Sequence, residues 1–416
     1  MAFAYRNGLL CAEDVPLDQI ARAHGTPCYV YSRAAIERAY GEYAAALAGR
    51  NALVCFSVKS NSNLAVLALL ARLGAGFDIV SGGELARVLA AGGDARRTLF
   101  SGVGKSESEI AQAIEAGILC LNLESEAELE RVAAVAARIG RQAPIAFRVN
   151  PDVDAKTHPY ISTGLKQNKF GVAHEDAERL YRRAASLPAV EVVGIGCHIG
   201  SQLTDAAPLV EATSRIVALA KRVEKAGIRL AHIDLGGGIG IRYHEESTQP
   251  IGRIVGAMLE RVDLRAAMLI LDPGRSIVGN AGVLLTRVEY LKPGATKNFV
   301  VVDAAMNDLM RPSLYDAWHE VRPVRASEAP AQAPRYDIVG PVCESSDVLA
   351  KDRALSVQAG DLLAIMSAGA YGMTMSSNYN SRPRIAEVMV DGARAHLVRR
   401  RETIESLYAL ESVPDW

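Results

Sequence analysis

Short apolar runs alternate with longer amphipathic segments through the first two thirds of the chain. Eight such runs have the length and composition of buried β-strands, and they cover residues 54–58, 77–80, 98–101, 119–123, 145–149, 192–197, 232–235 and 268–271. The segments between them, such as 64–73, 84–91 and 124–139, repeat apolar residues at a spacing near 3.6. That spacing is typical of helices that pack one face against a sheet.

Eight strand–helix units in series predict an α/β fold, a closed (β/α)8 TIM barrel of parallel strands. A doubly wound open sheet is the alternative that the same alternation allows. After residue 279 the pattern changes to strand-like runs with few long helical stretches between them, at 283–291, 299–303, 336–339, 362–366 and 386–390. The sequence therefore predicts a barrel followed by a β-rich domain.

The composition is that of a folded globular chain, because 50% of its 416 residues are hydrophobic. The 46 Lys and Arg residues nearly balance the 47 Asp and Glu residues, which disfavours nucleic acid or an anionic membrane as the main partner. The chain has no apolar run of membrane-spanning length and no signal-peptide pattern. Its six cysteines are scattered and form no zinc-type cluster, so we expect a reducing cytoplasm and no metal.

Polar residues directly after each apolar run are the candidates for chemistry, because the active site of a parallel barrel lies where the strands end. Lys59 follows the first run and His198 follows the sixth. Taken singly, such a lysine is usually solvated, and a lone histidine is usually a hydrogen-bonded core residue. A lysine inside a barrel mouth is instead partly desolvated, which favours the neutral amine that forms a Schiff base.

Three consecutive glycines, at positions 236–238, follow the seventh run. Consecutive glycines cost conformational entropy and are best explained where a backbone approaches a ligand closely. Their N–H groups can hold a phosphate, as loops near the seventh and eighth barrel strands often do. A dinucleotide fingerprint would need glycine where Ile241 stands, and a P-loop ending in Gly104-Lys105-Ser106 would need glycine where Leu99 stands. Nicotinamide and ATP are therefore disfavoured.

The eighth run leads into Asp272-Pro273-Gly274-Arg275. As a tetrapeptide this is an ordinary turn signal. At a barrel mouth it also makes a carboxylate and a guanidinium available together. A carboxylate that faces a pyridine nitrogen keeps the nitrogen protonated and makes the ring an electron sink.

Nine segments, weak singly but specific as an ordered set, span nearly the whole chain. They are 56–61 (FSVKSN), 77–84 (FDIVSGGE), 158–164 (HPYISTG), 168–171 (NKFG), 198–201 (HIGS), 234–238 (DLGGG), 306–312 (MNDLMRP), 340–345 (GPVCES) and 369–372 (GAYG). In this order they closely resemble the fold-type III pyridoxal-phosphate decarboxylases, which pair an alanine-racemase-like barrel with a β-domain. The resemblance implies a cofactor-binding barrel over residues 34–280. It also implies a β-domain, built from residues 1–33 and 281–416, that contributes substrate-binding and proton-donor residues.

The resemblance implies pyridoxal 5'-phosphate as the cofactor. The expected contacts to it come from Lys59, Asp78, His198, Ser201, Gly236, Gly237, Gly238, Asp272, Gly274, Arg275 and Tyr371. Lys59 is expected to hold the cofactor covalently, and His198 to stack on the pyridine ring. Ser201 and Gly238 are expected to hold the phosphate, and Asp272 to face the pyridine nitrogen.

The resemblance is nearest to the members that decarboxylate meso-diaminopimelate. It implies that the substrate is bound by Arg275, Arg311, Tyr315, Glu344 and Tyr371, and that Cys343 is the catalytic proton donor. Bidentate arginine contacts suit carboxylates at both ends of a substrate, whereas ornithine presents a distal amine. Decarboxylases of carboxynorspermidine or arginine, a racemase and an inactive relative are the alternatives. Arg311 and the Cys343 loop disfavour the racemase.

Two positions depart from the family pattern. Asp272 stands where glutamate is usual, so its carboxylate is expected to lie farther from the pyridine nitrogen. Ser346 stands where glycine is expected. In the family the Cys-Glu loop reaches the barrel of a second subunit, so the resemblance also implies a homodimer with shared active sites.

Overall fold

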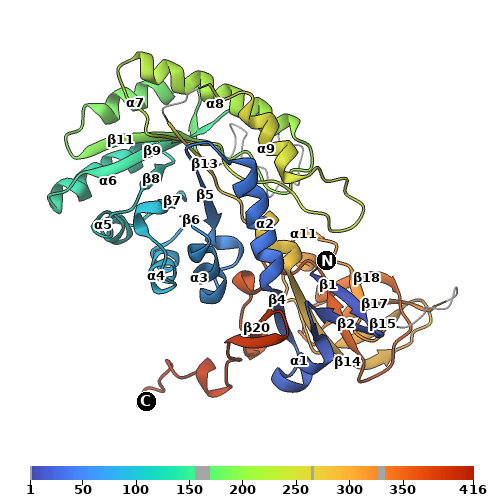
Figure 1. Ribbon diagram of the computed structural model, residues 1–416. Coiled ribbons are helices and arrows are strands. Elements are labelled where there is room, and N and C mark those ends of the chain that lie inside the picture. The colour runs from blue at the N-terminus through green and yellow to red at the C-terminus, as the bar shows by residue number, and fades with distance from the viewer. Residues whose placement is uncertain (1, 155–168, 264–266, 327–332) are drawn as a thin grey trace. The chain divides into compact units, whose positions relative to one another are not determined.

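The computed structural model describes residues 2–154, 169–263, 267–326 and 333–416. The sequence motif at 158–164 and the first residue of the motif at 168–171 therefore lie outside the described residues. The chain divides into two compact units (Figure 1). The β-unit comprises residues 1–38, 243–245 and 277–416, and the barrel unit comprises residues 39–242 and 246–276.

The barrel unit is a closed barrel of eight parallel strands, which confirms the predicted fold and excludes the open sheet. The eight predicted runs form its strands: β5 (Ala52–Ser57), β6 (Gly76–Ile79), β7 (Thr98–Phe100), β8 (Cys120–Leu123), β9 (Ala143–Asn150), β11 (Val190–Gly196), β12 (His232–Asp234) and β13 (Met268–Leu271). The ring closes because β13 pairs with β5, and β8 pairs with β9. A short strand, β10 (Val172–Ala173), also pairs with β9.

Helices surround these strands in the ribbon view (Figure 1). They are α2 (Arg33–Ala46), α3 (Leu64–Arg72), α4 (Gly82–Ala90), α5 (Glu107–Glu115), α6 (Glu126–Arg138), α7 (Ala177–Ala185), α8 (Ala207–Lys225) and α9 (Ile251–Leu259). Serine side chains begin three of them, because the hydroxyls of Ser81, Ser106 and Ser125 each accept the backbone N–H three residues on. These caps fix where each helix starts, directly after the loop that leaves a strand.

The β-unit is built around a nine-stranded sheet. Its strands are β4 (Cys28–Ser32), β14 (Gly282–Lys292), β15 (Asn298–Val302), β16 (Val321–Pro323), β17 (Arg335–Val339), β18 (Val348–Ala354), β19 (Leu362–Ile365), β20 (Ala386–Asp391) and β21 (Arg394–Arg399). The five predicted β-rich runs form β14, β15, β17, β19 and β20. Further elements are β1 (Phe3–Arg6), β2 (Leu9–Ala12), β3 (Val15–Pro16), α1 (Leu17–His24), α10 (Arg275–Val278) and α11 (Arg311–Tyr315).

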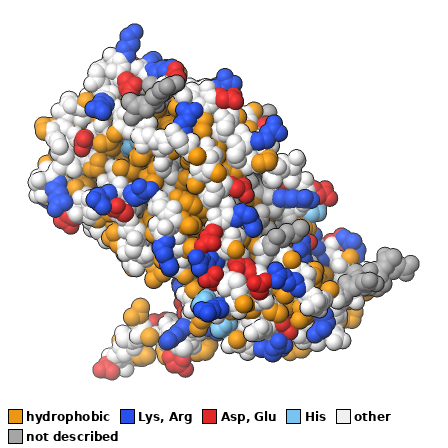
Figure 2. Space-filling view, in the orientation of Figure 1, with side chains coloured by type: hydrophobic (Ala, Val, Ile, Leu, Met, Phe, Trp, Pro, Cys, Tyr) orange, Lys and Arg blue, Asp and Glu red, His pale blue; other side chains and the backbone are white. Residues whose placement is uncertain are grey.

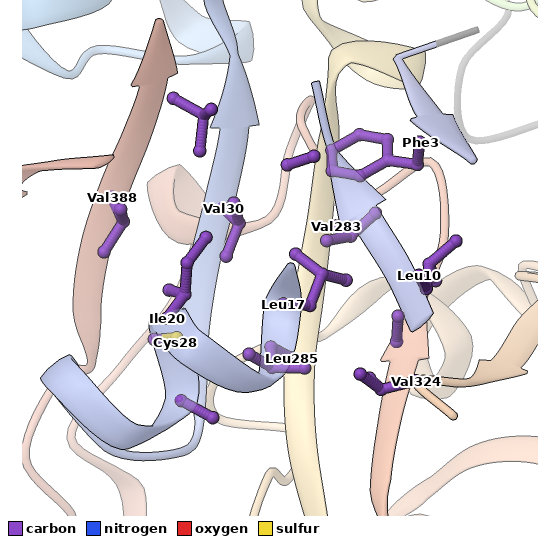
Figure 3. Close-up of a cluster of buried hydrophobic side chains, with 14 of the residues drawn as sticks. Phe3, Leu10, Leu17, Ile20, Cys28, Val30, Val283, Leu285, Val324 and Val388 are labelled. Atoms are coloured by element: carbon purple, nitrogen blue, oxygen red, sulfur yellow. The ribbon is translucent and has the colours of Figure 1, made fainter. Parts of the chain in front are cut away.

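A buried apolar cluster joins the amino-terminal segment to this sheet (Figure 3). Leu17 and Ile20 of α1 are almost completely buried, and they belong to the same cluster as Val30 of β4 and Val283 of β14. Burying side chains of this size stabilises a fold by about 1.5–3 kcal/mol each. The first residues of the chain are therefore an integral part of the β-unit.

Charged side chains of both signs are interspersed on the face seen in Figure 2, in keeping with the near-zero net charge. Within the described ranges, the helices are all too short or too polar to cross a membrane.

Candidate active site

A hollow of about 310 Å³, part of it open to solvent, lies in the barrel unit. Its lining comes mainly from the carboxyl ends of the strands and from residues directly after them: Lys59, Asp78, Ser101, Asn122, Arg148, Gly196, Cys197, His198, Asp234 and Asp272. We call this space the barrel hollow. The structure thus gathers Lys59, Asp78, His198 and Asp272, four of the residues that the sequence singled out.

Lys59 lies on a short 3-10 turn, Val58–Ser60, that directly follows β5. Its Nζ is 3.3 Å from Oδ2 of Asp78, and the lysine side chain is 36% exposed while that of Asp78 is 1% exposed. The hydroxyls of Ser57 and Ser101 donate to Asp78 at 2.9 and 2.6 Å. A buried, fully engaged carboxylate therefore anchors a lysine amine that remains accessible from the hollow.

The ionisation of Asp78 follows from these contacts. Burial by itself would raise the pKa of Asp78, but the Lys59 ammonium and the Ser101 and Ser57 hydroxyls outweigh burial and hold the pKa below its usual value. Asp78 is thus a stable negative charge next to the amine.

His198, in the loop after β11, and Asp272, directly after β13, lie close together in the barrel unit. Nδ1 of His198 lies 3.4 Å from Oδ1 of Asp272, and the Gly237 N–H donates to the same Nδ1 at 3.5 Å. Because Nδ1 accepts from Gly237, it does not also donate to Asp272. Oδ1 of Asp272 is buried and has no hydrogen-bond partner among the described residues.

The glycine loop after β12 is packed against neighbouring backbone. Gly236 and Gly238 have φ of +76° and +85°, a conformation that favours glycine. A Cβ at 236 would lie 2.5 Å from the Cys197 carbonyl oxygen, and one at 237 would lie 2.5 Å from Oδ1 of Asp272. Side chains are therefore excluded from this loop by neighbouring groups of the chain itself, whereas the predicted close approach to a ligand stays a prediction.

Ser201 and Arg275 lie together in the barrel unit. Nε and Nη2 of Arg275 are 3.3 and 3.0 Å from the Ser201 hydroxyl, and the arginine is only 7% exposed. Gly274 lies close to the start of the barrel, where an added Cβ would come within about 3 Å of Ser57 and Ser60.

The remaining predicted residues belong to the β-unit. Arg311, at the start of α11, is buried, and Tyr315 at its end is partly exposed. Cys343 and Glu344 are exposed in one loop, where Asn380 Oδ1 accepts the Cys343 N–H at 2.7 Å and Tyr379 donates its hydroxyl to Glu344 at 2.9 Å. The predicted residues therefore fall into a barrel group and a β-unit group. Tyr371, also in the β-unit, has φ of +55°.

Comparison with known proteins identifies the family. The family of pyridoxal-dependent decarboxylases, through its pyridoxal binding domain, matches residues 33–279. A diaminopimelate decarboxylase of Pseudomonas aeruginosa is 59% identical over 411 residues, 99% of each chain. The solved diaminopimelate decarboxylase of Helicobacter pylori, complexed with L-lysine, is 44% identical with a TM-score of 0.91 and covers 95% of this chain and 99% of that one. This chain belongs to the diaminopimelate decarboxylases. A solved member from M. jannaschii, also in complex with L-lysine, is 38% identical with a TM-score of 0.94 over 99% of this chain and 98% of that one.

Pyridoxal phosphate is the cofactor of this decarboxylase family, and the chemistry of residues in and near the barrel hollow suits it. The buried Oδ1 of Asp272 lacks a donor, and a protonated pyridine nitrogen would supply one. The amine of Lys59 suits the aldehyde, and the Ser201 hydroxyl and Arg275 guanidinium offer donors that suit a phosphate. The N–H groups of Gly236 and Gly237 already donate to Asp234 and His198. Asp272, which stands where glutamate is usual, thus leaves a buried acceptor oxygen unpaired in the barrel hollow.

The second departure from the family pattern causes no backbone strain. Ser346 is absent from the residues with positive φ, so glycine is not required there. Its carbonyl accepts the Ser313 hydroxyl at 2.7 Å. Serine thus fits this loop of the decarboxylase.

Four polar residues that line the barrel hollow were not predicted from the sequence: Ser101, Asn122, Arg148 and Asp234. Asn122 donates its side-chain amide to the Ser101 hydroxyl at 3.1 Å, and Nη2 of Arg148 donates to the His198 carbonyl at 3.1 Å. Burial raises the pKa of Asp234 well above its usual value, and the neighbouring Asp272 carboxyl raises it further. The available signal was a polar residue inside, or directly after, an apolar run.

Proposed function

We propose that the protein decarboxylates meso-2,6-diaminopimelate to L-lysine and carbon dioxide, the last step of lysine biosynthesis. The observation that carries the proposal is the constellation in the barrel hollow, where Lys59 is held by the buried Asp78 beside His198 and Asp272. Two solved neighbours named as diaminopimelate decarboxylases are complexed with L-lysine, the product of this reaction.

The barrel residues would hold the cofactor. When bound, pyridoxal phosphate supplies an electron sink for the bond that breaks at Cα. Lys59 would hold it through Nζ, and Asp78 keeps that amine in place. His198 would lie against the ring, Asp272 would keep the ring nitrogen protonated, and Ser201 with Gly238 would hold the phosphate.

The β-unit residues would bind the substrate and complete the proton transfer. Arg311 suits a substrate carboxylate, and Tyr315, Glu344 and Tyr371 would read the rest of the molecule. The scissile carboxylate leaves as carbon dioxide, and its bonding electron pair remains at Cα. The Sγ–H of Cys343 delivers a proton to that carbon, and the thiolate then regains a proton from solvent.

In this proposal, residues 34–280 form the barrel that binds the cofactor, and residues 1–33 and 281–416 form the β-domain that contributes substrate-binding and proton-donor residues. We include in the proposal a homodimer in which the exposed loop of Cys343 and Glu344 serves the barrel of a second copy. We also assign the enzyme to the cytoplasm, because a proton-donating thiol must stay reduced and all six cysteines are free.

A mixing experiment tests the shared site. Lys59→Ala and Cys343→Ala are each expected to be nearly inactive as homodimers. When the two are unfolded and refolded together, half of the dimers are mixed and each carries one intact site, so about a quarter of the wild-type activity should return. A mixture that stays inactive contradicts the shared site but leaves the reaction itself in place.

Release of carbon dioxide tests the reaction. Rates are compared for meso-diaminopimelate, lysine, ornithine, arginine and carboxynorspermidine at equal concentration. We expect meso-diaminopimelate to be fastest, with L-lysine as its product. A faster rate with any other substrate refutes the specificity, and absence of both cofactor absorbance and turnover supports an inactive relative.

A further inference from the structure

Arg311 is held from two sides within the β-unit. Nη1 of Arg311 lies 2.8 Å from Nε2 of His319, and its guanidinium carbon lies 4.6 Å from the centroid of the Tyr243 ring. His319 is completely buried, and Arg311 and Tyr243 are 6% and 9% exposed. The direction of the guanidinium is therefore set by buried groups rather than by solvent.

The hydrogen bonds fix the protonation state of His319. Nδ1 of His319 lies 2.8 Å from the carbonyl oxygen of Met366, which can only accept. Nη1 of Arg311 can only donate, so Nε2 must be the acceptor. The imidazole is thus neutral with its hydrogen on Nδ1, and it links the arginine to the backbone at the end of β19.

Aromatic packing fixes the other side of the arginine. Tyr243 meets His319 edge to face, with the ring centroids 5.3 Å apart. The next residue, His244, stacks on Trp318 with the centroids 4.1 Å apart. Two consecutive residues, 243 and 244, therefore pack against two consecutive residues, 318 and 319. This packing holds the Tyr243 ring over Arg311, where the ring attracts the guanidinium cation.

We propose that His319 is a positioning residue that aims Arg311 at the substrate carboxylate which stays on the product, and so sets the enzyme's preference for an amino acid over a diamine. This inference rests on the proposed function, in which Arg311 binds that carboxylate. His319 bonds to Arg311 and is itself completely buried, so we assign its effect on the substrate to the arginine that it positions. Without its acceptor nitrogen, the guanidinium loses the hydrogen bond that directs Nη1.

A pair of amide substitutions separates this role from a structural one. His319→Asn places an amide nitrogen near the position of Nδ1 and can keep the bond to Met366, but it is too short to reach Arg311. His319→Gln places an amide oxygen near the position of Nε2 and can accept from Arg311, but it gives up the bond to Met366. A structural role predicts that Asn is the milder change, whereas a positioning role predicts that Gln is.

The measurement is the affinity of the cofactor-loaded enzyme for L-lysine and for cadaverine, which lacks the carboxylate. His319→Asn is expected to weaken L-lysine binding about tenfold or more and to leave cadaverine binding unchanged. It should also raise KM for meso-diaminopimelate more than it lowers kcat. His319→Gln should stay within about threefold of wild type in all these quantities.

Three results would overturn the inference: an unchanged affinity of His319→Asn for L-lysine, an equal loss for L-lysine and cadaverine, or a larger effect of His319→Gln than of His319→Asn. Cofactor absorbance, measured for each variant, reports the intact barrel hollow. A wild-type enzyme that turns over no meso-diaminopimelate instead refutes the proposed function, and the inference falls with it.

Discussion

The ion pair of Lys105 and Glu128 is buried in the barrel unit, and it offers a test of how much a polar contact stabilises this fold. Nζ of Lys105 lies 2.8 Å from the Gly102 carbonyl, 2.6 Å from the Asn122 carbonyl and 2.8 Å from Oε1 of Glu128. The side chains of Lys105 and Glu128 are 1% and 8% exposed. The Lys105 amine is therefore engaged by the fold, as expected for a segment that is not a P-loop.

The expected cost of Lys105→Met follows from these contacts. The substitution keeps an unbranched side chain of similar length but removes the Nζ donor from two carbonyls and from Oε1 of Glu128, whose Oε2 still accepts the Glu124 N–H. Removing one partner of a buried pair destabilises a protein by about 3–5 kcal/mol. For a unit of this size, that loss lowers the melting temperature by roughly 10 °C. Adding Glu128→Gln removes the uncompensated charge and should restore about 1–3 kcal/mol.

Thermal unfolding followed by circular dichroism measures the effect, with Lys221→Met as the matched control. Lys221 pairs with Asp263 at 2.5 Å, but the two side chains are 48% and 66% exposed. Because solvent and salt screen such a pair, the control should stay within about 3 °C of wild type. If Lys105→Met melts no lower than Lys221→Met, burial does not decide the strength of these ion pairs and the reasoning is wrong.

Four further substitutions test other parts of the structure. Burial raises the pKa of Asp308 to about 7, so folding favours its protonated form. The stability that this carboxyl contributes is full below about pH 4 and is lost as the pH rises through 7. A pH series of melting curves should therefore show Asp308→Asn gaining up to about 4 kcal/mol of stability on wild type across that range. Gly238 has a positive φ and lies against the Gly200 carbonyl, so Gly238→Ala should weaken cofactor binding at least tenfold in an absorbance titration. The control is Gly256→Ala in α9, where there is open space for a side chain. This control should leave cofactor binding unchanged and stabilise the helix by about 0.5–1 kcal/mol. Asp272→Asn should retain cofactor absorbance but lower kcat by about a hundredfold or more, and a normal kcat would show that this carboxylate does not tune the ring.

Local pattern was sufficient to predict the barrel because its strands and helices are encoded within short windows. Each barrel strand corresponds to an apolar run in the sequence, and amphipathic helical segments lie between these runs. Serine caps mark where three of the helices begin. The β-unit depends more on distant pairing. All five residues of β4 are buried, but β4 pairs antiparallel with β14 and parallel with β20. No window around residues 28–32 contains that information, so the place of the first residues came only from a family resemblance.

The same contrast explains which site residues could be predicted. Lys59, His198 and Asp272 follow strands, and a parallel barrel brings all strand ends to one rim. The position of a residue after an apolar run is therefore enough to place it near the site. By contrast, the hold of His319 on Arg311 depends on packing between a short helix, a loop and β19, and the sequence gives no periodic signal for it.

The pKa values of acids in the barrel hollow depend on the groups that the closed barrel brings next to them, and not on residue type alone. Asp78, Asp234 and Asp272 read as three equivalent acids in the sequence, and all three line the same buried space. Asp78 keeps a lowered pKa because Lys59 and two hydroxyls stabilise its charge. The pKa of Asp234 is raised because burial and its acidic neighbours oppose a further charge, although the Gly236 N–H donates to it at 2.9 Å. One carboxyl thus has a lowered pKa and anchors an ammonium while another has a raised pKa, and only the closed ring of strands brings about this difference.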